Sequence, residues 1–332
     1  MRKLHYLFIL FTALMMVSCA NDDDYNPVII EEEEPLTLLP LLSEMKIFTS
    51  NLSALTPAQG VQLYEINSTL FTDYASKQRL IKLPEGKKMS YNSSSLLPDF
   101  PDNTLIAKTF YYNLDDRNPS LGKKIIETRV FIKLDDTWIA GNYIWNASQT
   151  EATLRDTGSI ENISYIDANG DTQTVDYQIP STQDCFTCHN NQAATIPIGL
   201  KLRNLNFTPS YTSQNQLDYL TANNLLEGVP SGSIAVLPDW TDDLNYSLEQ
   251  RARAYMDVNC AHCHMPGGSV PPGFLLDFQL ETPFDDTGIY TNRGEIVVRF
   301  GSTLASYRMP QLGRTVVHEP ALQMLTDYMD SL

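Results

Sequence analysis

Ile126-Glu127-Thr128-Arg129-Val130-Phe131-Ile132-Lys133-Leu134 is the stretch that decides the fold of the first half of the chain. Its even-numbered residues are all apolar or β-branched, and charged residues stand between several of them. This period of two predicts a half-buried β-strand, because successive side chains of a strand point to opposite faces of the sheet. Glu127, Arg129 and Lys133 are then expected on the solvated face.

The segments on either side of this strand also favour β-structure. Asp135-Asp136 provides a turn, and residues 138–145 are the expected hairpin partner. Ala168-Asn169-Gly170-Asp171 predicts a second hairpin turn between two further strand-like stretches. We therefore expect a β-rich, sandwich-like domain over residues 41–180.

From about residue 181 the pattern predicts helices instead of strands. Residues 247–258 begin with Ser247, and Gln250 stands three places later, which is the arrangement of a capping box. Residues 319–332 carry apolar side chains along one side of a predicted helix. A third helix is expected near residues 214–226, and Gly- and Pro-rich loops separate the three.

Two short segments carry the chemistry: Cys185-Phe186-Thr187-Cys188-His189 and Cys260-Ala261-His262-Cys263-His264. Both have the pattern C-x-x-C-H, in which two thiols attach to one haem and the histidine reaches its iron. A disulfide, a redox-active dithiol or a four-thiolate zinc site would also use cysteine pairs. None of these alternatives requires a histidine after the second cysteine in both segments. The sequence therefore predicts two covalently bound c-type haems, with Cys185, Cys188, Cys260 and Cys263 as attachment points and His189 and His264 as iron ligands.

The order of features around the second motif points to a known family. A predicted helix precedes this motif, a Pro/Gly loop follows it, and Met309 stands on a loop before the C-terminal helix. In this order, residues from about 245 to 332 resemble class I c-type cytochromes. The resemblance implies that Met309 is the sixth ligand of the second haem iron, and a core methionine is the alternative interpretation.

The first motif lacks a comparable distal ligand, because no methionine or histidine lies between His189 and Met256. Five-coordinate iron is one possibility. The candidate ligands, each also explicable as a structural residue, are Met89, Met256, Met265, His262 and His318. Lys201 and Arg203 follow this motif and either neutralise haem propionates or form the solvated face of a strand.

Further segments extend the resemblance beyond the haem motifs. Residues 64–74 (YEINSTLFTDY), 144–146 (IWN) and 251–264 (RARAYMDVNCAHCH) are similar to segments of a family of dihaem c-type cytochromes. The similarity covers roughly residues 45–332 and implies two haems and a β-rich front end, but no known substrate. The expected fold class is therefore α+β, with the β-rich domain followed by a mainly α-helical, cytochrome c-like dihaem region over residues 181–332.

The N-terminal residues predict export and a lipid anchor. Arg2 and Lys3 precede a mostly apolar stretch that ends in Met16-Val17-Ser18-Cys19. This ending resembles the lipobox of bacterial lipoproteins, and an ordinary signal peptide is the alternative. We expect residues 1–18 to be a signal peptide, acyl chains on Cys19 to anchor the protein to a membrane, and the acidic residues 19–40 to form a flexible tether. The outer membrane, on its periplasmic or surface face, is the expected location.

The charge of the chain limits the kinds of molecule that we expect it to bind. With 40 acidic and 23 basic residues the formal net charge is −17, which disfavours nucleic acid and favours a basic redox protein partner. Together these features predict a lipid-anchored dihaem cytochrome that transfers electrons in the cell envelope and has no catalytic residues. The alternatives are a peroxidase-like haem enzyme, the electron-accepting subunit of a dehydrogenase, and a surface lipoprotein that binds a glycan or protein.

Overall fold

The computed structural model describes residues 35–332, apart from residues 94–96, 193, 231, 233, 272 and 275. The predicted signal peptide, the lipidation site Cys19 and residues 19–34 of the predicted tether lie outside the described residues. Within the described part, no helix is both long enough and apolar enough to cross a bilayer. Residues Leu36–Leu332 pack as one compact unit, and the domain division at residue 180 stays a prediction.

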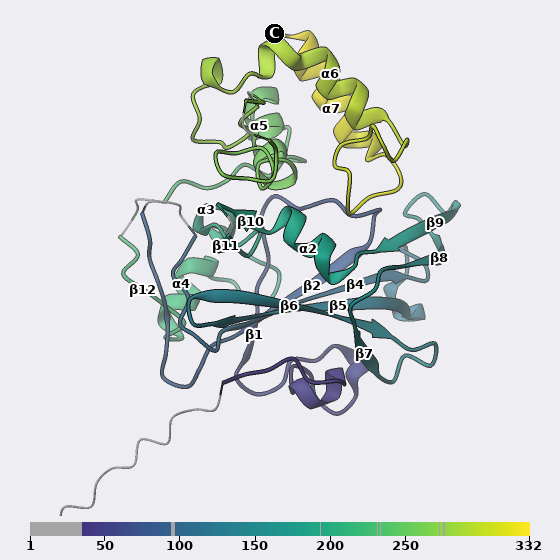
Figure 1. Cartoon of the computed structure of the whole chain (residues 1–332), viewed down its shortest axis with the longest axis vertical. Helices are drawn as coiled ribbons and strands as arrows, with labels where there is room; N and C mark the ends of the chain where they lie inside the picture. The colour runs from purple at the N-terminus through teal and green to yellow at the C-terminus, as the bar shows by residue number, and fades with distance from the viewer. Residues whose placement is uncertain are drawn as a thin grey trace, which may run out of the picture. The chain divides into compact units, whose positions relative to one another are not determined.

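A six-stranded antiparallel sheet lies at the centre of this unit, in the order β1-β2-β4-β5-β6-β7 (Figure 1). Its strands are β1 (Val61–Leu63), β2 (Ser76–Lys82), β4 (Leu105–Asn113), β5 (Lys123–Leu134), β6 (Thr137–Trp145) and β7 (Ala152–Arg155). Strand β5 contains the stretch quoted first and pairs with β4 on one side and β6 on the other. The predicted strand and its hairpin partner are thereby confirmed.

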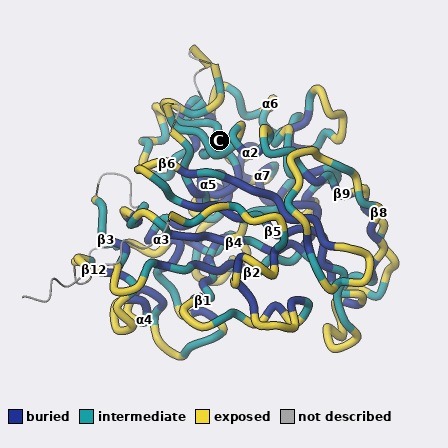
Figure 2. The backbone as a smooth tube through the Cα atoms, turned by 60° about the horizontal axis from the view of Figure 1, so that its bottom comes forward, coloured by how far each residue is buried: buried dark blue, intermediate teal, exposed yellow. Residues whose placement is uncertain are grey.

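Strand β5 is buried on both faces, so the prediction of a solvated face is wrong. Val130 and Ile132 lie in a core closed by the N-terminal segment, which includes the 3-10 helices η1 (Leu42–Met45) and η2 (Leu52–Ala54). On the opposite face, Phe131 is buried, and the side chain of Glu127 is 0% exposed. We call this second face, which carries Glu127, Arg129 and Phe131, the motif face. Figure 2 shows how little of the central strands is exposed.

A separate hairpin covers one end of the motif face. Strands β8 (Ser159–Ile166) and β9 (Thr172–Ile179) pair across the predicted turn, which confirms that hairpin. Their apolar residues pack against Phe110 and Ile144 of the sheet. The remaining short elements are η3 (Pro119–Leu121) and two two-stranded pairs, namely β3 (Met89–Ser90) with β12 (Leu226–Glu227) and β10 (Asn190–Asn191) with β11 (Ala194–Thr195).

The predicted fold class is wrong, because the region after residue 180 is not a mainly helical haem domain. The chain is 23% helix and 25% strand, and the six-stranded antiparallel sheet dominates it. Within the described residues of the stretch 189–247, only two short helices form, α3 (Leu202–Leu205) and α4 (Gln216–Ala222). Prolines and glycines such as Pro197 and Gly199 interrupt this stretch and keep helices short. Its leucines, among them Leu202, pack on Phe131 and Trp138 of the sheet.

Three longer helices pack around a core of their own, as Figure 1 shows: α5 (Leu248–Asn259), α6 (Ile289–Gly301) and α7 (Glu319–Asp330), with η4 (Phe284–Asp286) before α6. Helices α5 and α7 confirm two of the predicted helices. The Ser247 side chain accepts a hydrogen bond from the Gln250 amide, so the predicted capping box is present. Tyr255 of α5, Phe300 of α6 and Tyr328 of α7 meet in this core.

Residues 64–74, which we call the strap, connect β1 to β2 and bind a segment after the first motif and segments on both sides of the second motif. Three of its groups hydrogen-bond to later parts of the chain: Ser68 to Asn204, Phe71 to Asn259, and Asp73 to Thr315. These partners lie in α3, at the end of α5 and in the loop before α7. The strap therefore ties the sheet to the regions that carry the two C-x-x-C-H segments.

Candidate functional site

Both C-x-x-C-H segments form the same backbone turn. Helix α2 (Thr182–Cys188) ends in the first motif, and the His189 amide donates to the Cys185 carbonyl at 3.0 Å. Directly after α5, the His264 amide donates to the Cys260 carbonyl, also at 3.0 Å. In a helical turn, residues three and four apart are neighbours on one side. Each motif therefore gathers two thiols and one imidazole on one side of a turn.

The fold brings the two motifs together. The sulfur atoms of Cys188 and Cys263 and a ring nitrogen of His262 lie within 4.8 Å of one another. The Cys263 thiol also donates to the Thr187 carbonyl, with an S···O distance of 3.9 Å. All four motif cysteines are free thiols. The hydrogen bond between Cys188 and Cys263 raises the pKa of the first thiol and lowers the pKa of the second.

Two glycines allow this close approach of the loops. Gly267 has a φ of +82°, and its carbonyl accepts a hydrogen bond of 2.7 Å from the Gln192 amide, which follows the first motif. A Cβ atom at Gly268 would lie 2.3 Å from the Cys263 carbonyl oxygen. Any larger residue at position 268 would therefore force the second motif to shift.

The His189 ring is oriented for metal binding. Its Nδ1 lies 2.8 Å from the Ile196 carbonyl, which can only accept, so Nδ1 carries the proton and Nε2 keeps a free lone pair. Burial lowers the pKa of His189 to about 3, and Lys108 contributes to the same shift. The neutral ring packs on Phe131 with 4.5 Å between ring centroids. A carbonyl that fixes the tautomer in this way is typical of metal-binding histidines.

The two histidines of the second motif have unsatisfied nitrogens. Nδ1 of His264 and Nδ1 of His262 are buried, and neither has a hydrogen-bond partner among the described residues. The His264 ring lies beside Phe278, with 5.0 Å between ring centroids. Buried polar atoms are rarely left unpaired. Both nitrogens are therefore open to a hydrogen-bond partner that the described residues do not supply.

Met309 lies half-buried on the loop between α6 and α7. Its amide donates to the Arg299 carbonyl at 3.0 Å, and its carbonyl accepts from the Arg314 guanidinium at 2.8 Å. The buried Arg314 also donates to the carbonyls of Phe300 and Ser302. The loop that carries Met309 is thereby fixed to the end of α6, and the role of Met309 as an iron ligand stays a prediction.

The candidate distal ligands of the first motif separate into two groups. Met89 and Met256 are buried in two apolar cores, and His318 stacks on Phe71 and hydrogen-bonds to the Tyr255 hydroxyl. These contacts give each of the three a structural role. Met265 lies half-buried directly after the second motif, and a ring nitrogen of His262 lies within 4.8 Å of the Cys188 sulfur.

Lys201 and Arg203 do not present free charges to the first motif. Both bind the buried carboxylate of Asp257 in α5, at 3.1 Å and 2.6 Å respectively, and Arg203 also pairs with Glu281. The Leu280 amide donates to the same carboxylate. The sequence offered two interpretations of these cations, as partners of haem propionates or as a solvated strand face. Neither describes this arrangement, in which both cations join the segment after the first motif to the helix before the second.

Asp257→Asn is expected to lower the free energy of unfolding by about 3 kcal/mol near pH 7, because two enclosed cations lose their carboxylate partner. Burial opposes ionisation of Asp257, but Lys201 and Arg203 outweigh it and lower its pKa. Such stabilisation is complete above the unfolded-state pKa of about 4 and is lost as the pH falls through the folded value. Urea unfolding of both proteins between about pH 7 and pH 3 measures this difference. A difference that stays constant over that range would contradict the prediction.

The sequence interpretation missed a set of basic residues on the motif face. Across the strands, Arg79 of β2 is paired with Lys108 of β4, and Lys108 with Arg129 of β5. Directly opposed residues in neighbouring strands point to the same face. Lys77 stands two places before Arg79 on β2 and so shares this face. We call these four residues the cationic row. The alternation Lys77-Gln78-Arg79 beside apolar Leu80 and Ile81 is the signal that sequence reading could have used.

No family model, curated protein sequence or solved structure matches this chain.

Proposed function

We propose that this protein is a dihaem c-type cytochrome that transfers electrons in the cell envelope, anchored through Cys19. The observation that carries the proposal is that the two C-x-x-C-H segments share the hydrogen bond from the histidine amide to the carbonyl of the first cysteine and lie in contact in the fold. Haem, when bound, supplies an iron that accepts and releases one electron by changing between the ferric and ferrous states. No catalytic residue and no bond-breaking step are part of this proposal.

The described residues fit two covalently held haems. Cys185 and Cys188 would hold the first and Cys260 and Cys263 the second, and none of the four is in a disulfide. His189 offers Nε2 to the first iron, since its other ring nitrogen is engaged by a carbonyl. His264 would bind the second iron, but no described residue engages its Nδ1 in the way that the Ile196 carbonyl engages that of His189. Met309 would be the sixth ligand of the second iron, as the resemblance to class I cytochromes implies.

A metal ion held by Cys188, His262 and Cys263 is the second candidate, since their ligand atoms cluster within 4.8 Å. Structural zinc sites have four protein ligands. Among the described residues this cluster offers three, and it leaves Cys185, Cys260 and both motif-ending histidines without a role. The haem proposal uses all of these side chains and therefore accounts for more of the site.

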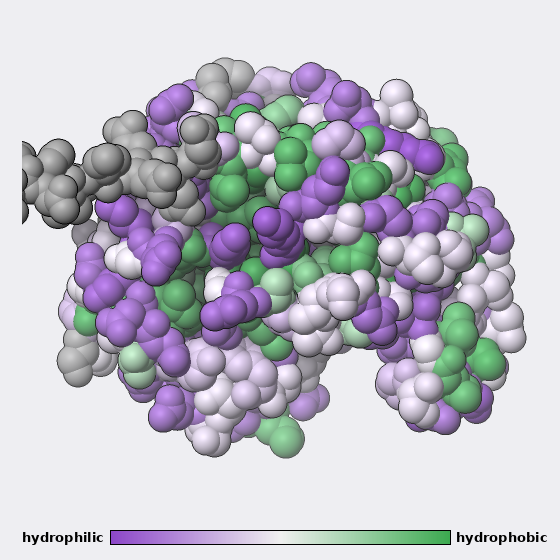
Figure 3. Space-filling model, turned by 90° about the horizontal axis from the view of Figure 1, so that it is seen from below, coloured by the Kyte–Doolittle hydropathy of each residue, from purple (hydrophilic) through white to green (hydrophobic). Residues whose placement is uncertain are grey.

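The contact between the motifs supports a single redox unit, because electrons would then pass between the two attachment sites within the protein. The acidic composition of the chain favours a basic redox partner. Hydrophilic residues are spread among hydrophobic ones over the face drawn in Figure 3. Long-range attraction between an acidic protein and a basic partner accelerates their encounter, and this attraction weakens with added salt.

The proposal is tested by haem counting on the full-length protein, expressed with export in a bacterium that attaches c-type haem. We expect two haems per chain, from the alkaline pyridine absorbance and the mass of the intact protein. A redox titration followed by absorbance should then show two one-electron transitions. Colourless protein that carries zinc, or in which the four thiols are bridged to one another, would overturn the proposal. The same chain expressed in the cytoplasm without the attachment system is the control.

A further inference from the structure

We propose that the cationic row, Lys77, Arg79, Lys108 and Arg129, is a carboxylate site that receives the propionates of the haem on the first motif. This inference rests on the proposed function, because it needs that haem to be attached. It assigns the motif face of the sheet a direct part in holding the haem.

The cationic row lies on the same side of the sheet as the first motif. Phe131, two places after Arg129 on β5, packs on the His189 ring. Lys108 and Arg129 both act electrostatically on His189, and Arg129 also acts on Cys185. Helix α2, which carries the first motif, packs against β6 of the same sheet. The row is therefore the part of the sheet that the first motif faces.

The protein balances the charges of the row only in part: Glu65 attracts Arg79, and Asp73 attracts Lys77, whose ammonium also donates to the Ala75 carbonyl at 2.9 Å. Glu127 is its buried acid, and that carboxylate already binds Arg129 at 2.5 Å, Asn142 at 2.6 Å and the Tyr177 hydroxyl at 2.6 Å. Within the described chain, neither the Arg79 guanidinium nor the Lys108 ammonium has a hydrogen-bond or ion-pair partner. Like charges placed directly opposite each other destabilise a sheet. An anion brought by a bound group would remove this repulsion.

Burial acts against the same charges. It lowers the pKa of Lys108 to about 7, and Arg79 and Arg129 add to this shift. It also lowers the pKa of Lys77, with further repulsion from Arg79 and Lys108. In a chain with a formal charge of −17, it is notable that one face of the sheet gathers three neighbouring basic side chains, of which Arg79 is buried and Lys77 and Lys108 are half-buried. Carboxylates such as haem propionates form strong, charge-assisted hydrogen bonds with these groups.

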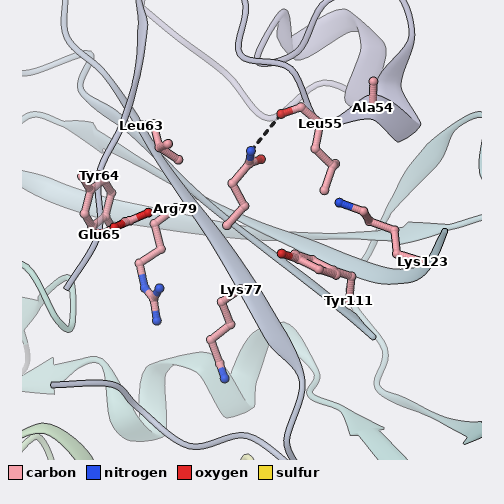
Figure 4. Close-up of a pocket in the computed structure, with 10 residues that line it drawn as sticks. Ala54, Leu55, Leu63, Tyr64, Glu65, Lys77, Arg79, Tyr111 and Lys123 are labelled. Carbon is pink, nitrogen blue, oxygen red and sulfur yellow. Dashed lines mark hydrogen bonds between the residues drawn. The ribbon is translucent and has the colours of Figure 1, made fainter. Parts of the chain in front are cut away.

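The side chains at the β2 end of the row point together. Figure 4 shows Lys77 and Arg79 extending the same way from β2, away from Leu55 and Lys123. A cavity of about 220 Å³ lies beside this strand, and Lys77, Arg79 and Lys123 all belong to its lining. Lys123 holds its ammonium 4.5 Å from the centre of the Tyr111 ring, which packs on the core at the other face of the sheet. Lys123 is thus a cation of the same sheet, outside the row, and serves as a matched control.

The test compares the variants Arg79→Gln and Lys108→Met with Lys123→Gln, each produced as the haem-loaded, full-length protein. Haems are counted first, and the midpoint potential of each haem is then measured by spectroelectrochemical titration. A nearby cation favours the ferrous iron, which carries one positive charge fewer. In each row variant we expect the ferrous-to-ferric ratio of one haem to fall about tenfold at a fixed electrode potential, a shift of about 59 mV. Lys123→Gln should leave both potentials unchanged.

The charge itself is tested by Lys108→Arg, which should keep the wild-type potential. Wild-type protein without haem would contradict the proposed function. Two haems per chain, with potentials in both row variants equal to those of Lys123→Gln, would overturn this inference alone. If the row instead takes a soluble anion, inorganic phosphate added at constant ionic strength will shift the wild-type potential but not that of the row variants. That result would also overturn the propionate assignment.

Discussion

Replacing Cys185 and Cys188 by alanine is expected to leave one haem per chain in place of two. Each thioether link needs its own thiol, and without both links the first haem is not retained through purification. Cys260→Ala/Cys263→Ala is expected to remove the other haem in the same way. Absorbance per chain and the mass of the intact protein measure the loss, and the redox titration of each variant should show a single transition.

The matched control is Thr187→Ala, which changes the same motif but none of its predicted ligands. It should keep two haems, because the Thr187 group that contacts Cys263 is the backbone carbonyl. A Cys185→Ala/Cys188→Ala protein that still carried two haems would refute the assignment of the first motif. Loss of both haems from a folded double variant would show that the two attachments depend on each other.

Glu127→Ala is expected to lower the free energy of unfolding by about 3–5 kcal/mol, the usual cost of removing one partner of a buried ion pair. The Glu127 side chain is 0% exposed and binds Arg129, Asn142 and Tyr177. Its loss leaves the Arg129 guanidinium and the Tyr177 hydroxyl without this partner, and it leaves the Asn142 amide with only its 3.4 Å bond to the Pro180 carbonyl. Urea unfolding of the wild type and the variant measures the difference.

The control for this prediction is Glu85→Ala, which removes an exposed carboxylate in the turn after β2. Surface changes of this kind usually alter stability by less than about 0.5 kcal/mol. Glu127→Gln keeps the side-chain shape and the capacity to accept hydrogen bonds, so it should fall between the two alanine variants. Equal stability of Glu127→Ala and Glu85→Ala would refute the structural role assigned to Glu127.

Short sequence patterns correctly predicted those strands, turns and helices whose formation depends on neighbouring residues in the chain. Alternation identified β5 and β6, a turn sequence identified the β8–β9 hairpin, and a capping box identified α5. The solvated face assigned to Arg129 was wrong, because the sequence period shows that a strand has two faces but not what covers each of them. Here the second face is covered by segments that follow β7, among them the leucines near α3.

The contact between the motifs could not be predicted from their sequences. It depends on how the strap binds Asn204, Asn259 and Thr315, three residues far apart in the chain. The predicted helical haem region failed for a related reason. Apolar residues between the motifs found a ready core on the sheet, so that stretch needed only short helices to bury them. The Lys201–Asp257–Arg203 network likewise appears only when α3 and α5 meet.

The nearness of Cys188 and Cys263 has a consequence for the biogenesis of the protein. Two thiols from different motifs that lie this close in the folded chain can be oxidised to a bridge, and such a bridge would block both attachment reactions. If the chain is exported and receives haem as proposed, porphyrin and oxidant would compete for the same sulfur atoms. Haem would have to be attached before Cys188 and Cys263 are oxidised to a disulfide. In the reverse order, the exported protein would stay without haem.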